Sequence, residues 1–491
     1  MAPDTLDTGA APLSAVIVGG GITGLSIAWY LEKAAREQGF DVSIVLVERE
    51  PSLGGKIRTH TEDGFVIEAG PDGFLLRKPW AIDLAEDLGL AEDIVYTQAG
   101  GASLLRDGKL HPIPRSMMGP APASPRDVWR ASFLSWPGRL RANLEPLVPK
   151  RENGAPESLG RMLSRRLGAE LTDTLLEPLT AGVYGGDAYG MNAEVLFPTL
   201  RQWEQQYGSL TRGIRETQKA ARTRPQPPAA FFSLRGGAQR LVEAIAGRLE
   251  RTEIVQGRIA DAVEHRQAGP QSTYLVTLDD GRAFDSGMVA LATPARDAGR
   301  LVGSFAPGLA RSLQEMQTTA TGSVYLAFPR EQVAHPLDSS GFLMPRSETG
   351  LVTGCTWMSS KWPGRSPEGH VLLRAFVGWA RDASFLEYSD TELVEVATET
   401  LRSTLGICGA PDRSWVNRWE EGLPQYRVDH PDWLEEIDRE LASHPGLFLS
   451  GASYRGIGVP DCVRQGRETA ERMAAFVTQR SPSQPVMAHG A

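Results

Sequence analysis

VGGGITGL, residues 18–25, decides the fold, because it joins a short apolar run to a segment with the character of a helix. Residues 14–18 are apolar and contain β-branched side chains, which predicts a buried parallel strand. A helix is predicted over residues 22–38 and a second strand over residues 43–48. Strand, helix and strand in this order predict a β-α-β unit.

The glycines of this stretch match the pattern of a dinucleotide-binding turn. Gly19, Gly21 and Gly24 fit G-x-G-x-x-G between a strand and a helix. Glycine lets the turn close tightly and lets the backbone approach a pyrophosphate, which then faces the free N–H groups of the helix N-terminus. Glu48 ends the second strand 24 residues after Gly24, where its carboxylate can accept hydrogen bonds from ribose hydroxyls. A tight turn without a ligand is the alternative, but this context predicts a dinucleotide site.

A glycine pair, Gly54-Gly55, follows soon after Glu48 and precedes Lys56. Such a pair lets the chain pass close to the phosphates of a dinucleotide, and Lys56 can neutralise part of their charge. A surface turn with a solvated lysine is the alternative. An acidic residue followed by a glycine pair is a flavoprotein pattern, so the combination favours FAD over NAD.

A third glycine site lies near the other end of the chain. Residues 450–452, Ser-Gly-Ala, follow a predicted strand at 447–450. Residues 456–460, Gly-Ile-Gly-Val-Pro, precede a helix predicted over about 460–477, and Pro460 suits its first turn. A helix cap without a ligand is the alternative. Glycine sites at both ends are best explained by one long cofactor between them, which predicts an FAD site built from the two ends of the chain.

The segments between these ends differ in their patterns. Residues 112–149 are rich in Pro, Arg, Trp and Met, which predicts irregular or short helical structure. An amphipathic helix is predicted to begin at Ser158 and to be broken by Pro178 and Gly182. Strands are predicted at 252–256, 259–264, 273–278, 287–292, 324–328, 350–357 and 371–377, a hairpin turn at 279–281, and helices at 241–249 and 390–405. Segments expected to lack regular structure are 1–12, 222–228 and 481–491.

Composition limits the functional classes. A chain of 491 residues with 41 % hydrophobic and 23 % charged residues is long enough for two or three globular domains. Its net charge of −9 argues against nucleic acid as a partner, because phosphate binding needs clustered Lys and Arg. The Cys and His residues show no spacing suited to a metal, and no apolar run approaches the roughly 20 residues of a membrane span. We therefore expect no metal, no transmembrane segment and a cytoplasmic protein.

Motifs spread over residues 15–477 resemble one family. Besides the glycine sites they are Glu68-Ala69-Gly70-Pro71-Asp72-Gly73-Phe74, Glu177-Pro178-Leu179 with Gly182-Val183-Tyr184-Gly185-Gly186-Asp187, Arg418-Trp419 with Leu423-Pro424-Gln425-Tyr426, and Gly456-Ile457-Gly458-Val459-Pro460-Asp461-Cys462. The sequence is similar to the porphyrinogen oxidases of haem synthesis, and most similar to the Gram-positive type that makes coproporphyrin.

The resemblance implies an α/β fold with a Rossmann-like FAD-binding domain of discontinuous segments, a mixed-sheet substrate domain and a helical insert. The FAD-binding domain is expected at 13–95, 231–300 and 441–480. The substrate domain is expected at 96–115, 183–230 and 301–440, and the insert at 116–182.

The resemblance also implies the site residues. Ile259 is expected to meet the adenine through its backbone. Arg77 and Lys78 are expected to bind propionates of the substrate, with Val183 in the wall of the cavity; a solvated basic pair is the alternative for Arg77 and Lys78. The other residues expected to contact FAD are Gly19, Gly20, Gly21, Ile22, Thr23, Gly24, Glu48, Arg49, Lys56, Gly70, Pro71, Asp72, Gly73, Trp419, Ile457, Gly458 and Val459.

The implied reaction is an FAD-dependent six-electron oxidation of coproporphyrinogen III to coproporphyrin III, in which molecular oxygen becomes hydrogen peroxide. No side-chain catalyst is expected, because the flavin carries the chemistry. A protoporphyrinogen IX oxidase and a flavin amine oxidase are alternatives, although residues 456–459 lack the aromatic residue that amine oxidases usually place before the last helix. A third alternative is a carrier of prenyl lipids that binds no flavin. The glycine pair and Glu48 argue against this alternative. Ferrochelatase is a candidate partner, and peripheral contact with a membrane is compatible with the resemblance.

Overall fold

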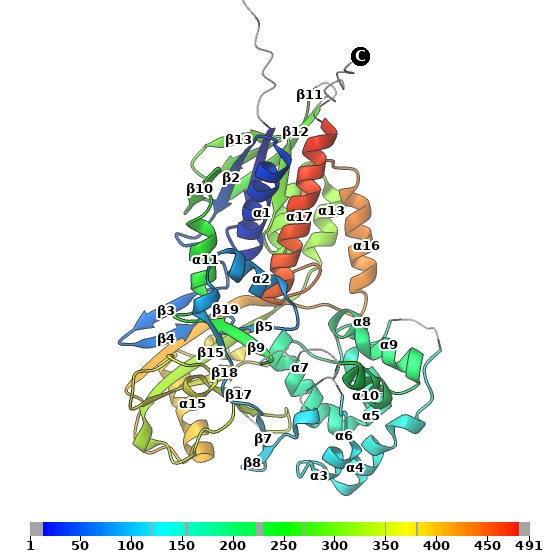
Figure 1. Ribbon diagram of the computed structural model, residues 1–491, viewed down its shortest axis with the longest axis vertical. Helices are drawn as coiled ribbons and strands as arrows, with labels where there is room; N and C mark the ends of the chain where they lie inside the picture. Colours follow the sequence, from blue (N-terminus) through cyan, green and yellow to red (C-terminus); the bar gives the residue numbers. More distant parts are fainter. Residues whose placement is uncertain are drawn as a thin grey trace, which may run out of the picture.

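The computed structural model describes residues 13–480 apart from 118, 120, 153–155, 222–228, 269–270, 349 and 380–381. The predicted linker and the two predicted disordered ends therefore lie outside the described residues. Figure 1 shows a sheet with long helices in the upper part, a larger sheet at the lower left and a group of helices at the lower right.

A five-stranded parallel sheet forms the centre of the upper part. Its strands are β1 (Leu13–Val18), β2 (Val42–Glu48), β10 (Thr252–Gln256), β14 (Met288–Leu291) and β20 (Leu447–Leu449). They lie in the order β10-β2-β1-β14-β20, and every neighbouring pair is parallel. Along β1, Ala15 and Ile17 join one hydrophobic core and Val16 and Val18 join another, because successive side chains point to opposite faces. The sheet thus takes strands from distant stretches of the chain.

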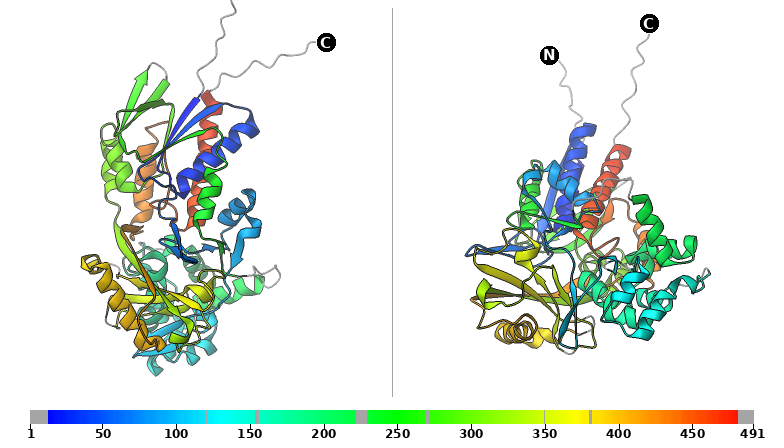
Figure 2. Two further views of the ribbon diagram at one scale, coloured as in Figure 1. Left: turned by 90° about the vertical axis from the view of Figure 1, so that its left-hand side faces the viewer. Right: turned by 60° about the horizontal axis from the view of Figure 1, so that its bottom comes forward.

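Other elements cover both faces of this sheet. The helices α1 (Ile22–Gln38) and α17 (Val459–Arg480) lie side by side on one face (Figures 1 and 2), and α1 confirms the predicted β-α-β unit. The predicted turn at 279–281 joins two strands of the meander that covers the other face. That face carries β11 (Ala260–Ala268), β12 (Gln271–Leu278), β13 (Ala283–Ser286), α12 (Ala295–Val302), α13 (Pro307–Gln314) and α16 (His430–Leu441).

The larger sheet is mixed. Its strands are β7 (Ser103–Arg106), β8 (Lys109–Pro112), β15 (Thr318–Pro329), β16 (Gly341–Leu343), β17 (Val352–Trp357), β18 (His370–Val377) and β19 (Arg413–Pro424). They lie in the order β19-β15-β18-β17-β16-β7-β8, and only β16 and β7 pair in parallel within this sheet. The helix α15 (Asp390–Leu405) packs against it and begins with a capping box between Ser389 and Glu392.

Short elements lie between the two sheets and carry the loops of the candidate site. They are β3 (Thr59–Glu62), β4 (Phe65–Glu68), β5 (Phe74–Leu75), β6 (Ile94–Tyr96), β9 (Phe231–Leu234), α2 (Trp80–Asp87), α11 (Gln239–Ala246) and α14 (Met358–Lys361). Strand β9 pairs with both β5 and β6, which draws residues 231–234 beside residues 74–96.

The helices at the lower right of Figure 1, called the insert below, share one hydrophobic core. They are α3 (Pro125–Arg130), α4 (Trp136–Asn143), α5 (Leu159–Leu167), α6 (Ala169–Leu171), α7 (Glu177–Tyr184), α8 (Ala193–Leu196), α9 (Pro198–Tyr207) and α10 (Leu210–Ala221). The short helices predicted within 112–149 are present as α3 and α4. The domain bounds given above remain predictions.

The expectation that Pro178 and Gly182 break the long helix is wrong. Helix α7 contains both residues and ends before Gly185, which has a φ of 60°. Pro178 closely follows a π-helical turn over Thr172–Leu176, and the helical backbone continues through both. The break lies earlier, at Gly168, which ends α5 with a φ of 95°.

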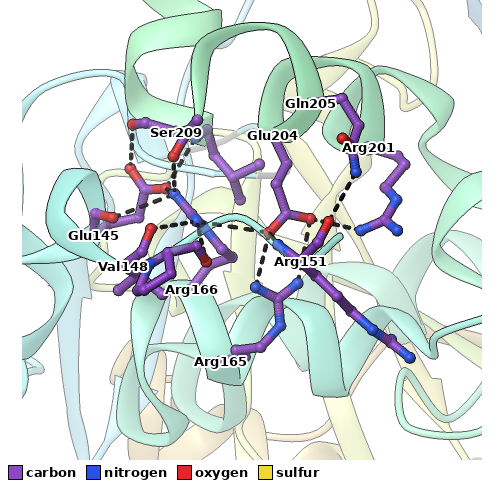
Figure 3. Close-up of polar contacts among 12 residues, drawn as sticks. Glu145, Val148, Arg151, Arg165, Arg166, Arg201, Glu204, Gln205 and Ser209 are labelled. Carbon is purple, nitrogen blue, oxygen red and sulfur yellow. Dashed lines mark hydrogen bonds and ion pairs between the residues drawn. The ribbon is translucent and has the colours of Figure 1, made fainter. Parts of the chain in front are cut away.

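Buried ion pairs join the helices of the insert (Figure 3). Arg166 and Glu145 have fully buried side chains and form one such pair. Glu145 also accepts a hydrogen bond from Ser209 Oγ at 2.6 Å. Glu204, equally buried, accepts a hydrogen bond from Arg165 Nη1 at 2.7 Å. Charged side chains on α5, α9 and the segment before α5 are thereby held in one network.

Candidate cofactor site

The first glycine turn has the geometry that a dinucleotide requires. Gly19 has a φ of 108°, and a Cβ atom on Gly24 would lie 1.9 Å from the carbonyl oxygen of Gly19. A Cβ on Gly21 would have its nearest neighbour among the described residues, the Cα of Gly55, 4.0 Å away. Gly19 and Gly24 therefore allow a close approach within the protein, whereas Gly21 faces free space at the N-terminus of α1. This is the division of roles expected of a turn that receives a pyrophosphate.

The glycine pair lies directly against this turn. Gly54 N–H donates to the carbonyl oxygen of Gly20 at 2.9 Å. A Cβ on Gly55 would be 3.3 Å from the Cα of Gly21. Lys56 Nζ donates to the carbonyl oxygen of Glu421 at 2.8 Å, so in this structure its ammonium group faces β19, and burial lowers its pKa. The role of Lys56 at the phosphates remains a prediction.

The carboxylate of Glu48 is buried beside the same turn. Its Oε2 accepts from Gly20 N–H at 2.6 Å and its Oε1 from Glu50 N–H at 2.9 Å. A carboxylate has about four acceptor positions, so capacity for ribose hydroxyls remains. Arg258 N–H donates to the carbonyl oxygen of Glu48 at 3.1 Å, which brings the following residue, Ile259, near this end of the site. Arg49 is exposed and faces Asp297 at 3.6 Å.

The structure brings the two ends of the chain together at this site. A Cβ on Gly451 would lie 3.8 Å from Thr23 Oγ1, and a Cβ on Gly466 would lie 2.6 Å from the Cβ of Ser26. Helix α17 therefore crosses α1 in close contact, with Ile457, Gly458 and Val459 at its start. The side chain of Tyr426 fixes the approach to α17, because its hydroxyl donates to Ala452 O at 2.6 Å and accepts from Gly456 N–H at 2.9 Å.

The loop from Gly70 to Gly73 fits tightly between these parts. A Cβ on Gly70 would lie 1.8 Å from the carbonyl oxygen of Lys56, and one on Gly73 would lie 2.5 Å from Trp362 Cζ2. Asp72 Oδ2 accepts hydrogen bonds from Lys361 Nζ and Trp362 Nε1, each at 2.7 Å. The carboxylate of Asp72, predicted to contact FAD, is thus anchored to α14. Sequence reasoning missed Lys361.

Trp419 lies on β19 beside this loop. Its Nε1 donates to the carbonyl oxygen of Ala69 at 2.8 Å, and the Arg58 guanidinium lies 5.4 Å from the centre of its ring. A cavity of about 570 Å³ borders Trp419 and is lined by polar side chains, among them Arg58 and Asn417. Trp419 therefore stands where the larger sheet meets the segment that carries the glycine pair.

The predicted substrate residues gather near the start of α17. Lys78 Nζ lies 2.5 Å from Asp461 Oδ2, and Arg77 is exposed. Burial and the charge of Asp461 raise the pKa of Tyr184 to about 12, while Arg77 lowers it, so α7 ends close to both charges. Val183, beside Tyr184, is 60 % exposed. Lys78 therefore lies at the start of α17, and the contact of Arg77, Lys78 and Val183 with a substrate remains a prediction.

The described histidines are spread over the fold, although the rings of His265 and His444 meet edge to face with centroids 5.8 Å apart. His430 is buried, its Nε2 lies 2.8 Å from the carbonyl oxygen of Tyr454, and its ring stacks on Tyr426 at 4.2 Å. These contacts hold His430 in the core as a structural histidine. Within the described ranges, no group of three or more Asp, Glu, His or Cys side chains could hold a metal ion. No helix in those ranges combines the length and apolar character needed to cross a membrane.

Known proteins share both the sequence pattern and the fold. Residues 22–474 match the family described as flavin containing amine oxidoreductase. The chain is 35 % identical over 456 residues to a coproporphyrinogen III oxidase of Bacillus subtilis (strain 168), with 92 % of this chain and 96 % of the relative covered. It is 32 % identical over 470 residues to the enzyme of the same name from Staphylococcus aureus (strain NCTC 8325 / PS 47), with 94 % of this chain and 99 % of the relative covered.

Solved structures agree with these relatives. A candidate protoporphyrinogen oxidase from Exiguobacterium sp. 255-15 is 32 % identical and has a TM-score of 0.83, with 95 % of this chain and 99 % of that chain covered. A reduced UDP-galactopyranose mutase shares the fold. It is 18 % identical and has a TM-score of 0.69, with 96 % of this chain and 95 % of that chain covered. The chain is therefore an FAD-dependent oxidoreductase that belongs to the flavin-containing amine oxidoreductases and, among them, to the coproporphyrinogen III and protoporphyrinogen oxidase family.

Proposed function

We propose that this chain oxidises coproporphyrinogen III to coproporphyrin III in haem biosynthesis, with molecular oxygen as the electron acceptor and hydrogen peroxide as the second product. The observation that carries the proposal is the position of Lys78 and Arg77 at the start of α17, beside glycine turns from both ends of the chain. The identity to enzymes named for this reaction, 35 % and 32 %, supports it.

The chain contributes binding and orientation to this reaction. When bound, FAD supplies a ring that accepts electrons from the substrate. Gly21 and the N-terminus of α1 would hold the pyrophosphate, Glu48 would accept hydrogen bonds from the ribose, and the loop from Gly70 to Gly73 would border the ring. We expect no side-chain base, because pyrrole protons can pass to solvent, and we expect exclusion of water around the reacting carbon to help the reaction.

The four propionates of coproporphyrinogen III would be recognised by cations at the rim of an otherwise apolar site. Lys78 is the principal candidate, because it is half-buried and its ammonium group is paired with Asp461. A propionate would take the place of Asp461 or share the ammonium group with it. Protoporphyrinogen IX, which has two propionates and two vinyl groups, depends less on such cations.

The test is the substitution Lys78→Ala, with KM measured separately for coproporphyrinogen III and protoporphyrinogen IX. We expect KM to rise for both substrates, by roughly tenfold for the loss of one charge-assisted hydrogen bond and by more for coproporphyrinogen III. Lys33→Ala is the matched control, since Lys33 forms an exposed ion pair with Asp87 elsewhere on the protein. Unchanged KM values in Lys78→Ala would show that Lys78 does not bind propionate. Failure of the wild-type holoenzyme to oxidise either porphyrinogen would overturn the proposed function itself.

We also propose that the insert makes peripheral contact with an anionic membrane. Trp136 is 72 % exposed and Leu147 is 75 % exposed, and three more exposed apolar side chains on the same segment are Trp129, Leu140 and Leu144. Exposed apolar side chains of this size mark interaction surfaces. The exposed cations beside them, Arg126, Arg130 and Lys150, suit anionic headgroups.

Sedimentation with phosphatidylglycerol vesicles tests this contact. We expect the wild type to sediment with the vesicles, and the double substitution Trp136→Ser and Leu147→Ser to remain in solution. Tyr388→Ser is the control, because Tyr388 is exposed but lies outside the insert. Equal sedimentation of all three proteins would refute the contact. A ferrochelatase that takes up the product is the alternative occupant, and it would bind the wild type, but not the double variant, without vesicles.

A further inference from the structure

Two largely buried cations lie against the carboxylate of Asp72, which belongs to the loop from Gly70 to Gly73. Asp72 accepts a hydrogen bond from Lys361 Nζ at 2.7 Å, and Arg374 Nη1 lies 3.9 Å from the other carboxylate oxygen of Asp72. Each of the three side chains is less than one fifth exposed. Burial opposes ionisation of Asp72, but the charges of Lys361 and Arg374 outweigh it and hold the pKa of its carboxyl well below the usual range. Asp72 is therefore ionised between the two cations.

Arg374 is fixed against the backbone of the loop. It lies in the apolar strand β18, and its Nη2 donates to the carbonyl oxygen of Gly70 at 2.9 Å. Its guanidinium lies over the rings of Tyr325 and Phe376, at 5.4 Å and 4.8 Å from their centres. Its Nε is buried and has no hydrogen-bond partner among the described residues. The cation is held in place by these contacts and is only partly balanced by Asp72.

A second buried pair adjoins the first and leaves the balance of charge positive. Arg365 Nη1 lies 3.1 Å from Glu68 Oε1, two residues before Gly70. Three cations, Lys361, Arg374 and Arg365, thus face two carboxylates, Asp72 and Glu68. Burial raises the pKa of Glu68 despite the charge of Arg365, so protonation of Glu68 would only increase the positive excess. In a low-dielectric interior such an excess acts more strongly than it would in water.

The loop that carries Asp72 borders the cofactor site. Gly70 is in contact with the Lys56 backbone, and the adjoining Gly55 lies against Gly21 of the first turn. The same loop is tied to β19 through Ala69 and Trp419. A flavin ring that extends from the pyrophosphate at Gly21 toward the start of α17 would pass over it.

We propose that Lys361 and Arg374, together with Asp72 of the loop that lies between them, set the reduction potential of the bound flavin. When a C–H bond of the substrate breaks and its electron pair and hydrogen move to the ring as a hydride, the ring gains one unit of negative charge. The positive excess beside the loop stabilises that charge, whereas Asp72 opposes it. The inference rests on the proposed function only through the position of the flavin beside the loop, and Lys361 and Arg374 act as positioning residues because they contact the loop that carries Asp72.

The experiment measures the two-electron midpoint potential of the purified holoenzyme by photoreduction with a reference dye, without any porphyrinogen. We expect Lys361→Met to shift the equilibrium toward oxidised flavin by about tenfold or more, which corresponds to about 30 mV for a two-electron couple. We expect Asp72→Asn to shift it in the opposite direction. Lys33→Met, the same substitution in an exposed pair, should leave the potential unchanged.

Shifts of the midpoint potential in opposite directions in Lys361→Met and Asp72→Asn would show that these side chains act through their charge and not through the structure of the loop. Damage to the loop would weaken FAD binding in both variants, which a titration of the apoprotein with FAD measures independently of the potential. Shifts of the same sign, or shifts no larger than that of Lys33→Met, would overturn the proposal. Neither the midpoint potential nor the FAD titration needs a porphyrinogen substrate. A failure of this proposal can therefore be distinguished from a failure of the proposed function.

Discussion

The cofactor site and the insert are built on opposite principles. At the cofactor site the decisive position lacks a side chain and faces free space, since a Cβ on Gly21 would meet no described atom closer than 4.0 Å. In the insert the decisive positions carry the longest charged side chains, with Arg166 and Glu145 fully buried. The first region makes space for a ligand, whereas the second fills its own interior. A substitution at Gly21 should therefore weaken FAD binding without loss of folding, whereas loss of a buried charge in the insert should lower stability without loss of the site.

The largest effect is expected from Arg166→Met in the insert. This substitution leaves Glu145 buried without its cation, which costs about 3–5 kcal/mol when one partner of a buried pair is removed. The measurement is urea unfolding of the apoprotein followed by circular dichroism. The double substitution Arg166→Met with Glu145→Gln should recover part of the loss, because no unpaired charge remains.

Arg402→Met is the control for this prediction, since Arg402 pairs with Glu399 on the surface of α15. At temperatures where Arg166→Met is still folded, its dissociation constant for FAD should equal that of the wild type. Equal stability of Arg166→Met and Arg402→Met would show that the network does not hold the insert together. Weaker FAD binding by the folded Arg166→Met protein would show that the two regions are coupled.

Gly21→Ala should produce the converse result. Gly21 has a φ of −70° and a ψ of 176°, which alanine adopts without strain, and its Cβ would meet no described atom closer than 4.0 Å. The added methyl group would instead occupy the space through which a pyrophosphate approaches the backbone. We expect the dissociation constant for FAD to rise at least tenfold, measured by quenching of flavin fluorescence, while the urea midpoint of the apoprotein stays the same.

Gly24→Ala is the informative companion to Gly21→Ala. Its Cβ would lie 1.9 Å from the carbonyl oxygen of Gly19, so this variant should lose stability as well as FAD binding. Wild-type affinity for FAD in Gly21→Ala would mean that no phosphate approaches this turn. The pair of variants thus distinguishes glycine required by a ligand from glycine required by packing.

The contrast between the regions explains what the sequence could reveal. Gly19, Gly21, Gly24 and Glu48 were recognisable because each meets a local requirement of one β-α-β unit, within residues 13–48. The two glycine sites at opposite ends also predicted correctly that the ends meet, since a single cofactor explains both. Backbone requirements of this kind can be recognised in the sequence, because few residues other than glycine satisfy them.

Ion pairs between residues far apart in the chain cannot be recognised from the sequence in this way. Lys361 and Asp72 are separated by 289 residues, and nothing near either residue points to the other. Lys78 was predicted to meet a propionate, but nothing near Lys78 in the chain indicates its partner Asp461. Arg374 did offer a signal, because an arginine inside the apolar run of β18 is rarely buried without a partner. Pro178 was a wrong guide to the end of the helix, because the helical backbone continues from the π-helical turn just before it through this residue.

The smallest effect is expected at His430, which lies where the two ends of the chain meet the rest of the fold. Burial lowers its pKa from the ordinary value of 6.5, although the carbonyl oxygen of Tyr454 at 2.8 Å favours the charged form. Below pH 6.5 the unfolded chain therefore binds a proton that the folded chain does not. Stability should fall as the pH drops from 6.5 toward the lower pKa of the folded state, by no more than about 1.4 kcal/mol per pH unit.

His430→Gln tests this assignment, because glutamine can still donate to Tyr454 O but does not titrate. We expect its free energy of unfolding to depend less on pH between 5 and 7 than that of the wild type, in parallel urea titrations. His60→Gln, at an exposed histidine, should behave as the wild type. If His430→Gln keeps the full wild-type dependence, another group is responsible. Because the His430 ring stacks on Tyr426, whose hydroxyl binds Gly456, acid should also weaken FAD binding in the wild type more than in His430→Gln.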